Sequence, residues 1–268
     1  MNKGKNVFLL IMKASIKAQL KNKKDFIFQM MIWFVFTFTP YVGLRILFQR
    51  FSLIEGDWSV WQISIIYAVL GISYDSARMF GRSLDSFHRY VKNGRFDALI
   101  IRPIPIFTQL LSQDFFISRL AGIFQYGLVF IVSTMKLKGF VSIYVLLILS
   151  VISALSCFFI FLGLLTIYAS LCFLTKDRNL FTDMIVDTTA SIGYLPINLL
   201  FKPIRIILTW FIPLYFVLYR QFDLFFHCNE YSQSLLYVNG LLSIVVCVIY
   251  FLLTMILFRF FQRFYKSE

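Results

Sequence analysis

The fold class is decided by FVSIYVLLILSVISALSCFFIFLGLLTIYASLCFL, residues 140–174, which contains no Asp, Glu, Lys or Arg. A helix needs only about 20 apolar residues to cross the roughly 30 Å hydrocarbon core of a bilayer. The rest of the chain has the same character, since 59% of its 268 residues are apolar and 15% are charged, with a mean hydropathy of +0.78. The sequence therefore predicts an all-α integral membrane protein and excludes soluble enzymes and secreted disulfide-rich domains.

Working outward from this run, further apolar runs lie at 26–48, 60–80, about 110–135, 181–201, 203–219 and 235–258. The run 203–219 has 17 residues, begins at Pro203 and is interrupted by Pro213, so as one helix it would barely cross the core. We interpret it as a re-entrant pair of short helices on the outer side. The remaining runs predict six transmembrane helices in a single domain that covers residues 1–268.

Basic residues support this topology. The chain has 26 Lys and Arg against 13 Asp and Glu, and short cytoplasmic loops collect positive charge. Six spans with both termini in the cytoplasm put most of these residues on the inner side, whereas seven spans would export the basic tail. The excess is therefore a topology signal, with no nucleic-acid partner implied.

The first 25 residues predict an interfacial helix on the inner leaflet. Lys13, Lys17, Lys21 and Lys24 recur at helical spacing, which places them on one stripe facing anionic lipid. A basic tail that only sets orientation is the alternative.

The segment GRSLDSFHRYVKNGRFDALIIRPIPIF, residues 81–107, is the one substantial cytoplasmic piece between the predicted spans two and three. Asp85 and Arg89 stand at i and i+4, Gly94 favours a helix end, and Pro103 and Pro105 terminate a second short helix that begins at Arg95. The pattern predicts two short amphipathic helices at the membrane surface. It fits either a solvated loop or a docking element.

The pattern Gly-Arg-Phe-Asp-x-Leu-x-x-Arg-Pro at 94–103, together with the N-terminal helix, the six spans and the proline-punctuated run before the last span, resembles the ABC-2 type permeases of bacterial ATP-binding-cassette exporters. The resemblance implies that residues 81–107 contain a coupling helix seated in a groove of an ATPase, with Phe96 or Leu99 as its anchor. It also implies two ATPase subunits, a second permease chain, identical or related, and the bacterial cytoplasmic membrane. The residues that it assigns to the ATPase contact are Asp85, Arg89, Lys92, Gly94, Arg95, Phe96, Asp97, Leu99 and Arg102.

The chain has no G-x-x-x-x-G-K-[ST] motif, which is the phosphate-binding loop of many ATPases. We therefore expect no cofactor on this chain, with ATP and Mg held by the partner ATPase. We also expect no metal or catalytic site, because His88 and His227 are remote in sequence and no Cys, His and acidic residues have the spacing of a metal site or a catalytic set. The resemblance implies export of an amphipathic or hydrophobic cargo, which includes lipids, peptides, antibiotics and drugs. An ATP-independent secondary carrier is the alternative, although such carriers favour internal repeats that this sequence lacks.

Charged residues inside predicted spans mark candidate functional positions, because a mid-membrane charge costs roughly 2.5 to 3.5 kcal/mol. Asp187 lies one turn deeper than Asp183 in the run 181–201. With the adjacent Thr188 it is a candidate for the cargo pathway, whereas Asp183 suits a helix start. At the inner ends of spans two and three, the sequence predicts local pairs of Asp75 with Arg78 and of Asp114 with Arg119.

Overall fold

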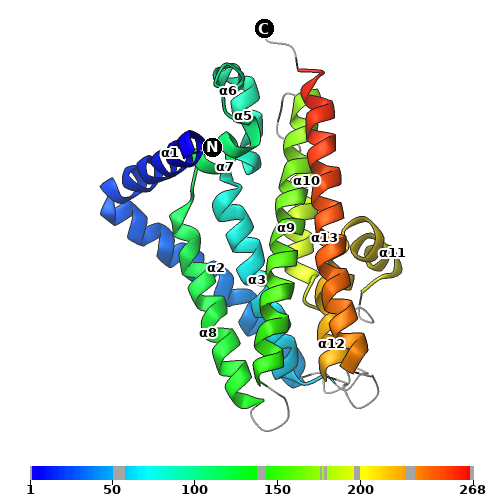
Figure 1. Cartoon of the computed structure of the whole chain (residues 1–268). Helices are drawn as coiled ribbons and strands as arrows, with labels where there is room; N and C mark the ends of the chain where they lie inside the picture. Colours follow the sequence, from blue (N-terminus) through cyan, green and yellow to red (C-terminus); the bar gives the residue numbers. More distant parts are fainter. Residues whose placement is uncertain are drawn as a thin grey trace.

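The structure, a computed structural model, describes residues 2–50, 58–137, 143–175, 177, 180–195, 200–226 and 233–265. Within these ranges every regular element is a helix. The long helices are α2 (Lys23–Arg50), α3 (Val60–Phe80), α8 (Leu120–Lys136), α9 (Ile143–Thr175) and α13 (Gln233–Gln262). They form a bundle in which α2 is inclined to the others (Figure 1). The all-α prediction is confirmed for the described residues.

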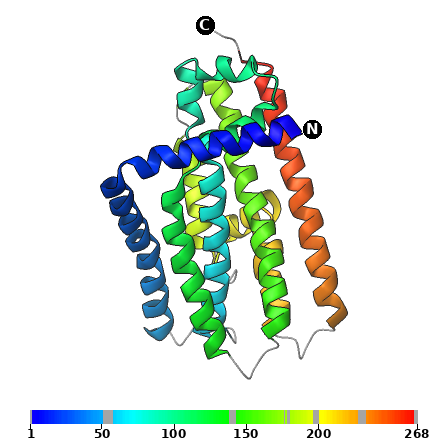
Figure 2. The same ribbon diagram turned by 60° about the vertical axis from the view of Figure 1, so that its left-hand side comes forward.

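The N-terminal helix α1 (Asn2–Lys21) lies across one end of this bundle (Figure 2). It ends at Lys21, before the predicted limit of residue 25, and Asn22 separates it from α2. Lys13, Lys17 and Lys21 of α1 are exposed, whereas Lys24, the fourth member of the predicted stripe, belongs to α2.

Four helices are long and apolar enough to cross a membrane: Lys23–Phe48, Ile117–Lys136, Ile143–Thr175 and Leu235–Gln262. A fifth candidate is the pair Lys202–Phe211 and Tyr215–Phe226, which is bent by 79°. The bend encloses Pro213, where the sequence predicts an interruption. The chain is thus an integral membrane protein with four or five candidate spans among the described residues.

The predicted helix over 181–201 is wrong in its length. Helix α10 (Leu180–Ile192) has 13 residues, which corresponds to about 20 Å at 1.5 Å per residue, and residues 196–199 lie outside the described ranges. Helices α9 and α13 run in the same direction (Figures 1 and 2), so the chain between them has to return along the bundle. The described part of this return consists of short elements: α10, α11 (Lys202–Ile206), the π-helical turns Ile207–Phe211 and Tyr215–Tyr219, and α12 (Arg220–Phe226).

The predicted helix over 110–135 is also divided. It consists of α7 (Ile106–Gln113), a break, a 3-10 turn at Ile117–Arg119, and α8. Helix α1 closes the break: the Ser15 hydroxyl accepts from the Phe115 backbone N–H at 3.2 Å, and the Gln19 side-chain oxygen accepts from the Ile117 backbone N–H at 3.2 Å. Residues distant in sequence thus satisfy backbone donors that a continuous helix would have paired internally.

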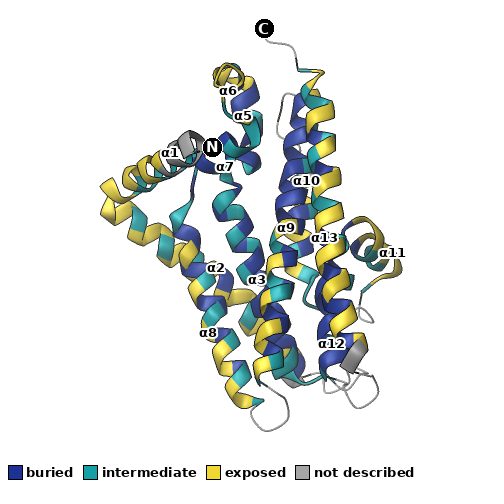
Figure 3. Ribbon diagram, in the orientation of Figure 1, coloured by how far each residue is buried: buried dark blue, intermediate teal, exposed yellow. Residues whose placement is uncertain are grey.

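Helix α3 forms the centre of the bundle. A capping box at Ser59 and Gln62 starts it. Its buried residues include the charged Asp75 and the consecutive run from Ile65 to Ala68, whose side chains project to all sides of the helix. In contrast, α2 and α13 carry long exposed apolar faces (Figure 3). A helix that carries charged residues is therefore enclosed by protein, whereas the apolar faces are available to lipid.

Two glycines allow α3 and α8 to approach closely. Gly71 of α3 faces the ring of Tyr126, and Gly122 of α8 faces the Asp75 carboxylate, so that an added Cβ at either glycine would overlap these groups. By contrast, an added Cβ at Gly127, also in α8, meets no atom within 4 Å. Helix packing in membranes commonly depends on such small residues.

We expect Gly122→Ala to destabilise the protein by about 1–3 kcal/mol, because Asp75 is buried and cannot yield without breaking its own contacts. Gly127→Ala is the matched control and should be neutral or stabilising by up to about 1 kcal/mol through helix propensity. Thermal unfolding of the two variants in the same detergent checks this difference. Equal unfolding temperatures would contradict the close approach at Gly122.

Candidate functional site

The residues of the predicted coupling element form a surface segment, which we define as residues 82–103. It contains α4 (Arg82–Asp85), α5 (Phe87–Lys92) and α6 (Arg95–Ile100) and lies at the same end of the bundle as α1 and the C-terminal end of α13 (Figure 1). Gly94 has φ = 64°, a left-handed conformation that favours glycine, and it separates α5 from α6. The sequence locates this turn correctly, but the first predicted helix is broken at Ser86.

Phe96 and Leu99 do not form the outward face of the surface segment. Their exposed fractions are 0% and 1%, and the Phe96 ring lies 5.1 Å from Phe173 of α9 and 4.9 Å from Tyr265, which follows α13. The Leu99 carbonyl accepts from the Gln109 side chain at 3.1 Å. The prediction that Phe96 or Leu99 anchors in a partner's groove is therefore wrong, since both fasten the segment to its own bundle.

The outward face of the surface segment is basic with an apolar tip. Lys92 forms an exposed ion pair with Asp177 at 2.9 Å. At the tip, the exposed fractions of Ile100 and Ile101 are 47% and 83%. Among the other predicted contact residues, Arg89, Gly94, Arg95 and Arg102 are exposed, whereas Asp85 and Asp97 are partly buried.

Arg78 of α3 connects the surface segment to α10. Its guanidinium lies 2.7 Å from Asp187 and 3.6 Å from Asp85, and the Tyr74 hydroxyl donates to the same Asp187 oxygen at 2.6 Å. The predicted cargo residue Asp187 and the predicted coupling residue Asp85 thus share one cation. Because these residues are far apart in sequence, no local pattern could show the connection.

A second ion pair is enclosed within the bundle. The Asp75 carboxylate of α3 and the Arg119 guanidinium lie 2.7 Å apart, with side-chain exposed fractions of 0% and 4%, and the guanidinium lies 3.5 Å from the centre of the Trp33 ring. The predicted local pairs are wrong: Asp75 pairs with Arg119 rather than with Arg78, and Asp114 accepts from the Tyr90 hydroxyl at 2.6 Å. Sequence spacing favoured partners three to five residues apart, whereas the structure pairs residues that are distant in sequence.

Both ion pairs border a cavity of about 220 Å³, which we call the polar cavity. Its charged lining residues are Asp75, Arg78, Arg119 and Asp187. Four tyrosines also line it: Tyr67, Tyr74, Tyr126 and Tyr194. Two carboxylates and two guanidiniums give a lining without net charge, so the cavity suits a polar or zwitterionic group among aromatic rings.

Thr188 does not share the polar cavity with Asp187. It borders a separate, mostly apolar cavity of about 260 Å³ between α10 and the turn at Ile207 and Leu208. Adjacent residues on a helix project about 100° apart, so the two predicted cargo residues face different spaces.

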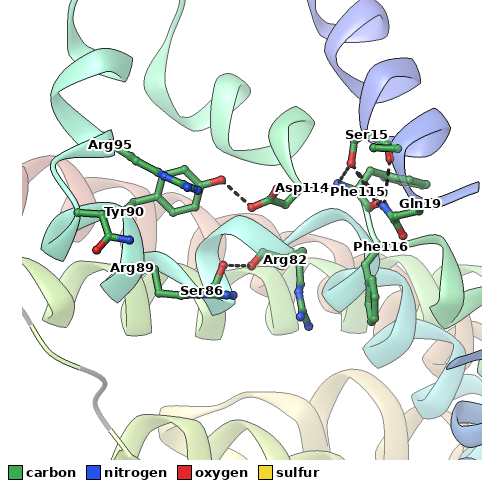
Figure 4. A pocket seen from close by; sticks show the side chains of 12 residues that line it. Ser15, Gln19, Arg82, Ser86, Arg89, Tyr90, Arg95, Asp114, Phe115 and Phe116 are labelled. Atoms are coloured by element: carbon green, nitrogen blue, oxygen red, sulfur yellow. Dashed lines mark hydrogen bonds between the residues drawn. The ribbon is translucent and has the colours of Figure 1, made fainter. Parts of the chain in front are cut away.

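A larger cavity of about 470 Å³, which we call the arginine cavity, lies between α1 and the surface segment. Arg82, Arg89 and Arg95 line it together with Asp114, and Ser15 and Gln19 of α1 form the opposite wall (Figure 4). In the described part of the chain, no group of three or more His, Cys, Asp or Glu side chains could hold a metal ion.

Comparison with curated proteins gave no match, and comparison with solved structures gave none. A family model described as ABC-2 family transporter protein matches residues 34–268. The match includes most of α2, the surface segment, the lining of the polar cavity except Trp33, and α13. The chain therefore belongs to the ABC-2 transporter family, as a membrane permease component.

Proposed function

We propose that this protein is the membrane subunit of an ABC exporter, which moves an amphipathic or hydrophobic cargo with ATP hydrolysed by separate ATPase subunits. The observation that carries the proposal is the ionic connection from Asp187 through Arg78 to Asp85. It joins a cavity among the helices to the segment that the resemblance assigns to ATPase contact. Two ATPase subunits and a second permease chain, identical or related, would complete the transporter, with ATP and Mg held by the ATPases.

The proposed topology has six spans with both termini in the cytoplasm of a bacterium. The four long apolar helices supply four spans. Helix α3 and the broken return between α9 and α13 would supply the other two, with the bent pair re-entering from the outer side. The lysines of α1 and the arginines of the surface segment lie at one end of the bundle, which the positive-inside rule assigns to the cytoplasm.

In the proposed mechanism, closure of the ATPase subunits displaces the surface segment. Phe87 and Phe96 pack against Phe173 at centroid distances of 5.0 and 5.1 Å, so the displacement reaches α9 directly. Arg78 would carry the same displacement to α10, because it holds Asp85 and Asp187 together. Movement of α10 changes the wall of the polar cavity, where we place the cargo.

Arg78→Gln tests this proposal. We expect the variant to insert and to bind the ATPase, but to lose cargo stimulation of ATP hydrolysis by about 5- to 150-fold, the usual range of a coupling free energy. The measurement is ATP hydrolysis by the reconstituted transporter with and without cargo.

Lys136→Gln is the control. It removes one exposed positive charge at the C-terminal end of α8, and it should leave cargo stimulation of ATP hydrolysis unchanged. Full stimulation in Arg78→Gln would contradict the ionic connection. Cargo transport that is driven by an ion gradient and needs no ATPase would favour a secondary carrier.

A further inference from the structure

We propose that the arginine cavity binds the phosphate group of an anionic membrane lipid. The cavity measures about 470 Å³ and is bounded by α1 on one side and by the surface segment on the other. This binding site is additional to cargo transport. It assigns a ligand to a surface where the membrane meets the cytoplasmic end of the protein.

The charges of the cavity are unbalanced. Arg82, Arg89 and Arg95 all line it, and the ion pairs found within the described ranges include none of these three guanidiniums. Asp114 supplies the carboxylate of the lining, and this carboxylate accepts a hydrogen bond from the Tyr90 hydroxyl at 2.6 Å. The lining thus retains an excess of two positive charges for an anion.

Arg82 is the most enclosed of the three arginines. It is partly buried, whereas Arg89 and Arg95 are exposed, and its guanidinium lies 4.4 Å from the centre of the Phe116 ring. Burial lowers the pKa of Arg82 below its usual range; the Asp85 carboxylate opposes this shift, whereas the positive charges of Arg119 and Arg89 add to it. An anion in the cavity would relieve both effects, and guanidinium groups bind phosphate oxygens with two parallel hydrogen bonds.

The position of the cavity favours a lipid phosphate over a soluble one. Arg82 comes directly after Gly81 at the end of α3, and Phe116 directly precedes the turn that starts α8. The floor of the cavity therefore lies at the ends of two bundle helices, the depth at which lipid headgroups occur. The exposed lysines of α1, which lie outside the cavity lining, would raise the local concentration of anionic lipid.

Lipid binding can be measured on the full-length chain in a neutral detergent, without an ATPase. The probes are phosphatidylglycerol, phosphatidylcholine and inorganic phosphate, and retention is measured by native mass spectrometry. We expect retention of phosphatidylglycerol alone. Replacing Arg82, Arg89 and Arg95 together by Gln should weaken the binding of phosphatidylglycerol on the order of 100-fold, since each basic residue near an anionic lipid contributes a similar free energy of binding.

The matched control replaces Lys13, Lys17 and Lys21 by Gln, which removes the same charge from α1 outside the cavity and should weaken retention less than about 10-fold. Equal losses in the two triple variants would overturn the site in favour of diffuse attraction. Equal retention of inorganic phosphate and phosphatidylglycerol would overturn the lipid as ligand. Unchanged lipid retention in the triple arginine variant would overturn the site, and loss of ATPase binding by that variant in a separate assay would assign the arginines to the ATPase instead.

If the triple arginine variant does not fold, Arg89→Gln with Arg95→Gln replaces it, because both side chains are exposed. The double variant should still weaken retention by roughly 10- to 50-fold, and unchanged retention would contradict the proposal. Failure of lipid binding would leave the proposed transport function intact, since the measurement includes neither ATP nor cargo.

Discussion

Asp75→Ala is expected to destabilise the protein by about 3–5 kcal/mol, the usual cost of removing one partner from a buried ion pair. The substitution leaves the Arg119 guanidinium enclosed without its carboxylate, because the two side chains are 0% and 4% exposed. It also leaves a gap opposite Gly122, which lies against the carboxylate. Thermal and denaturant unfolding in one detergent measure the loss.

Asp177→Ala is the control, because it breaks an ion pair with Lys92 whose side chains are 67% and 73% exposed. Exposed pairs contribute about 0–1 kcal/mol, so this variant should unfold almost as the native protein does. Replacing Asp75 and Arg119 together by apolar residues should recover part of the stability. Similar unfolding temperatures for Asp75→Ala and Asp177→Ala would show that the Asp75 pair does not stabilise the bundle.

Ile101→Asp is expected to reduce ATPase binding by at least roughly 30-fold, as loss of a central interface anchor does. Ile101 is 83% exposed at the tip of the surface segment, where the partner would contact it, so the charge should leave the unfolding temperature unchanged. Phe96→Ala should behave in the opposite way and cost about 3–5 kcal/mol of stability, because Phe96 is fully buried. Recovery of the partner ATPase with each purified variant, compared with unfolding temperatures, separates the two roles.

Much of the fold follows from the sequence. Residues 140–174 predict α9, the proline at 213 predicts the interruption of the last short run, and Gly94 predicts the turn within the surface segment. These features depend on local composition and backbone preference. The ten residues 94–103 also indicated the family, which the match over 34–268 shows.

The remaining features depend on contacts between distant residues. Hydropathy placed a full helix at 181–201, but the length of α10 is 13 residues, because composition identifies apolar segments without fixing where a helix ends. Amphipathic spacing placed Phe96 on an apolar face, but such a face can pack on a partner or on the chain itself. The pairing of Asp75 with Arg119 and of Arg78 with Asp187 requires the packing of α3 against its neighbours.

Site-specific photo-crosslinking from position 101 tests whether an ATPase drives this membrane subunit through the surface segment. A photoreactive residue at position 101 is compared with one at position 144, because Ile101 and Tyr144 are 83% and 81% exposed. Ile101 directly follows α6 and Tyr144 lies in the first turn of α9, and α6 and the start of α9 lie at opposite ends of the bundle (Figure 1). We predict an adduct from position 101 to a chain that carries a G-x-x-x-x-G-K-[ST] motif, identified by mass spectrometry, and none from position 144. Active cargo transport with no such adduct from position 101, or with equal adducts from both positions, would contradict the account.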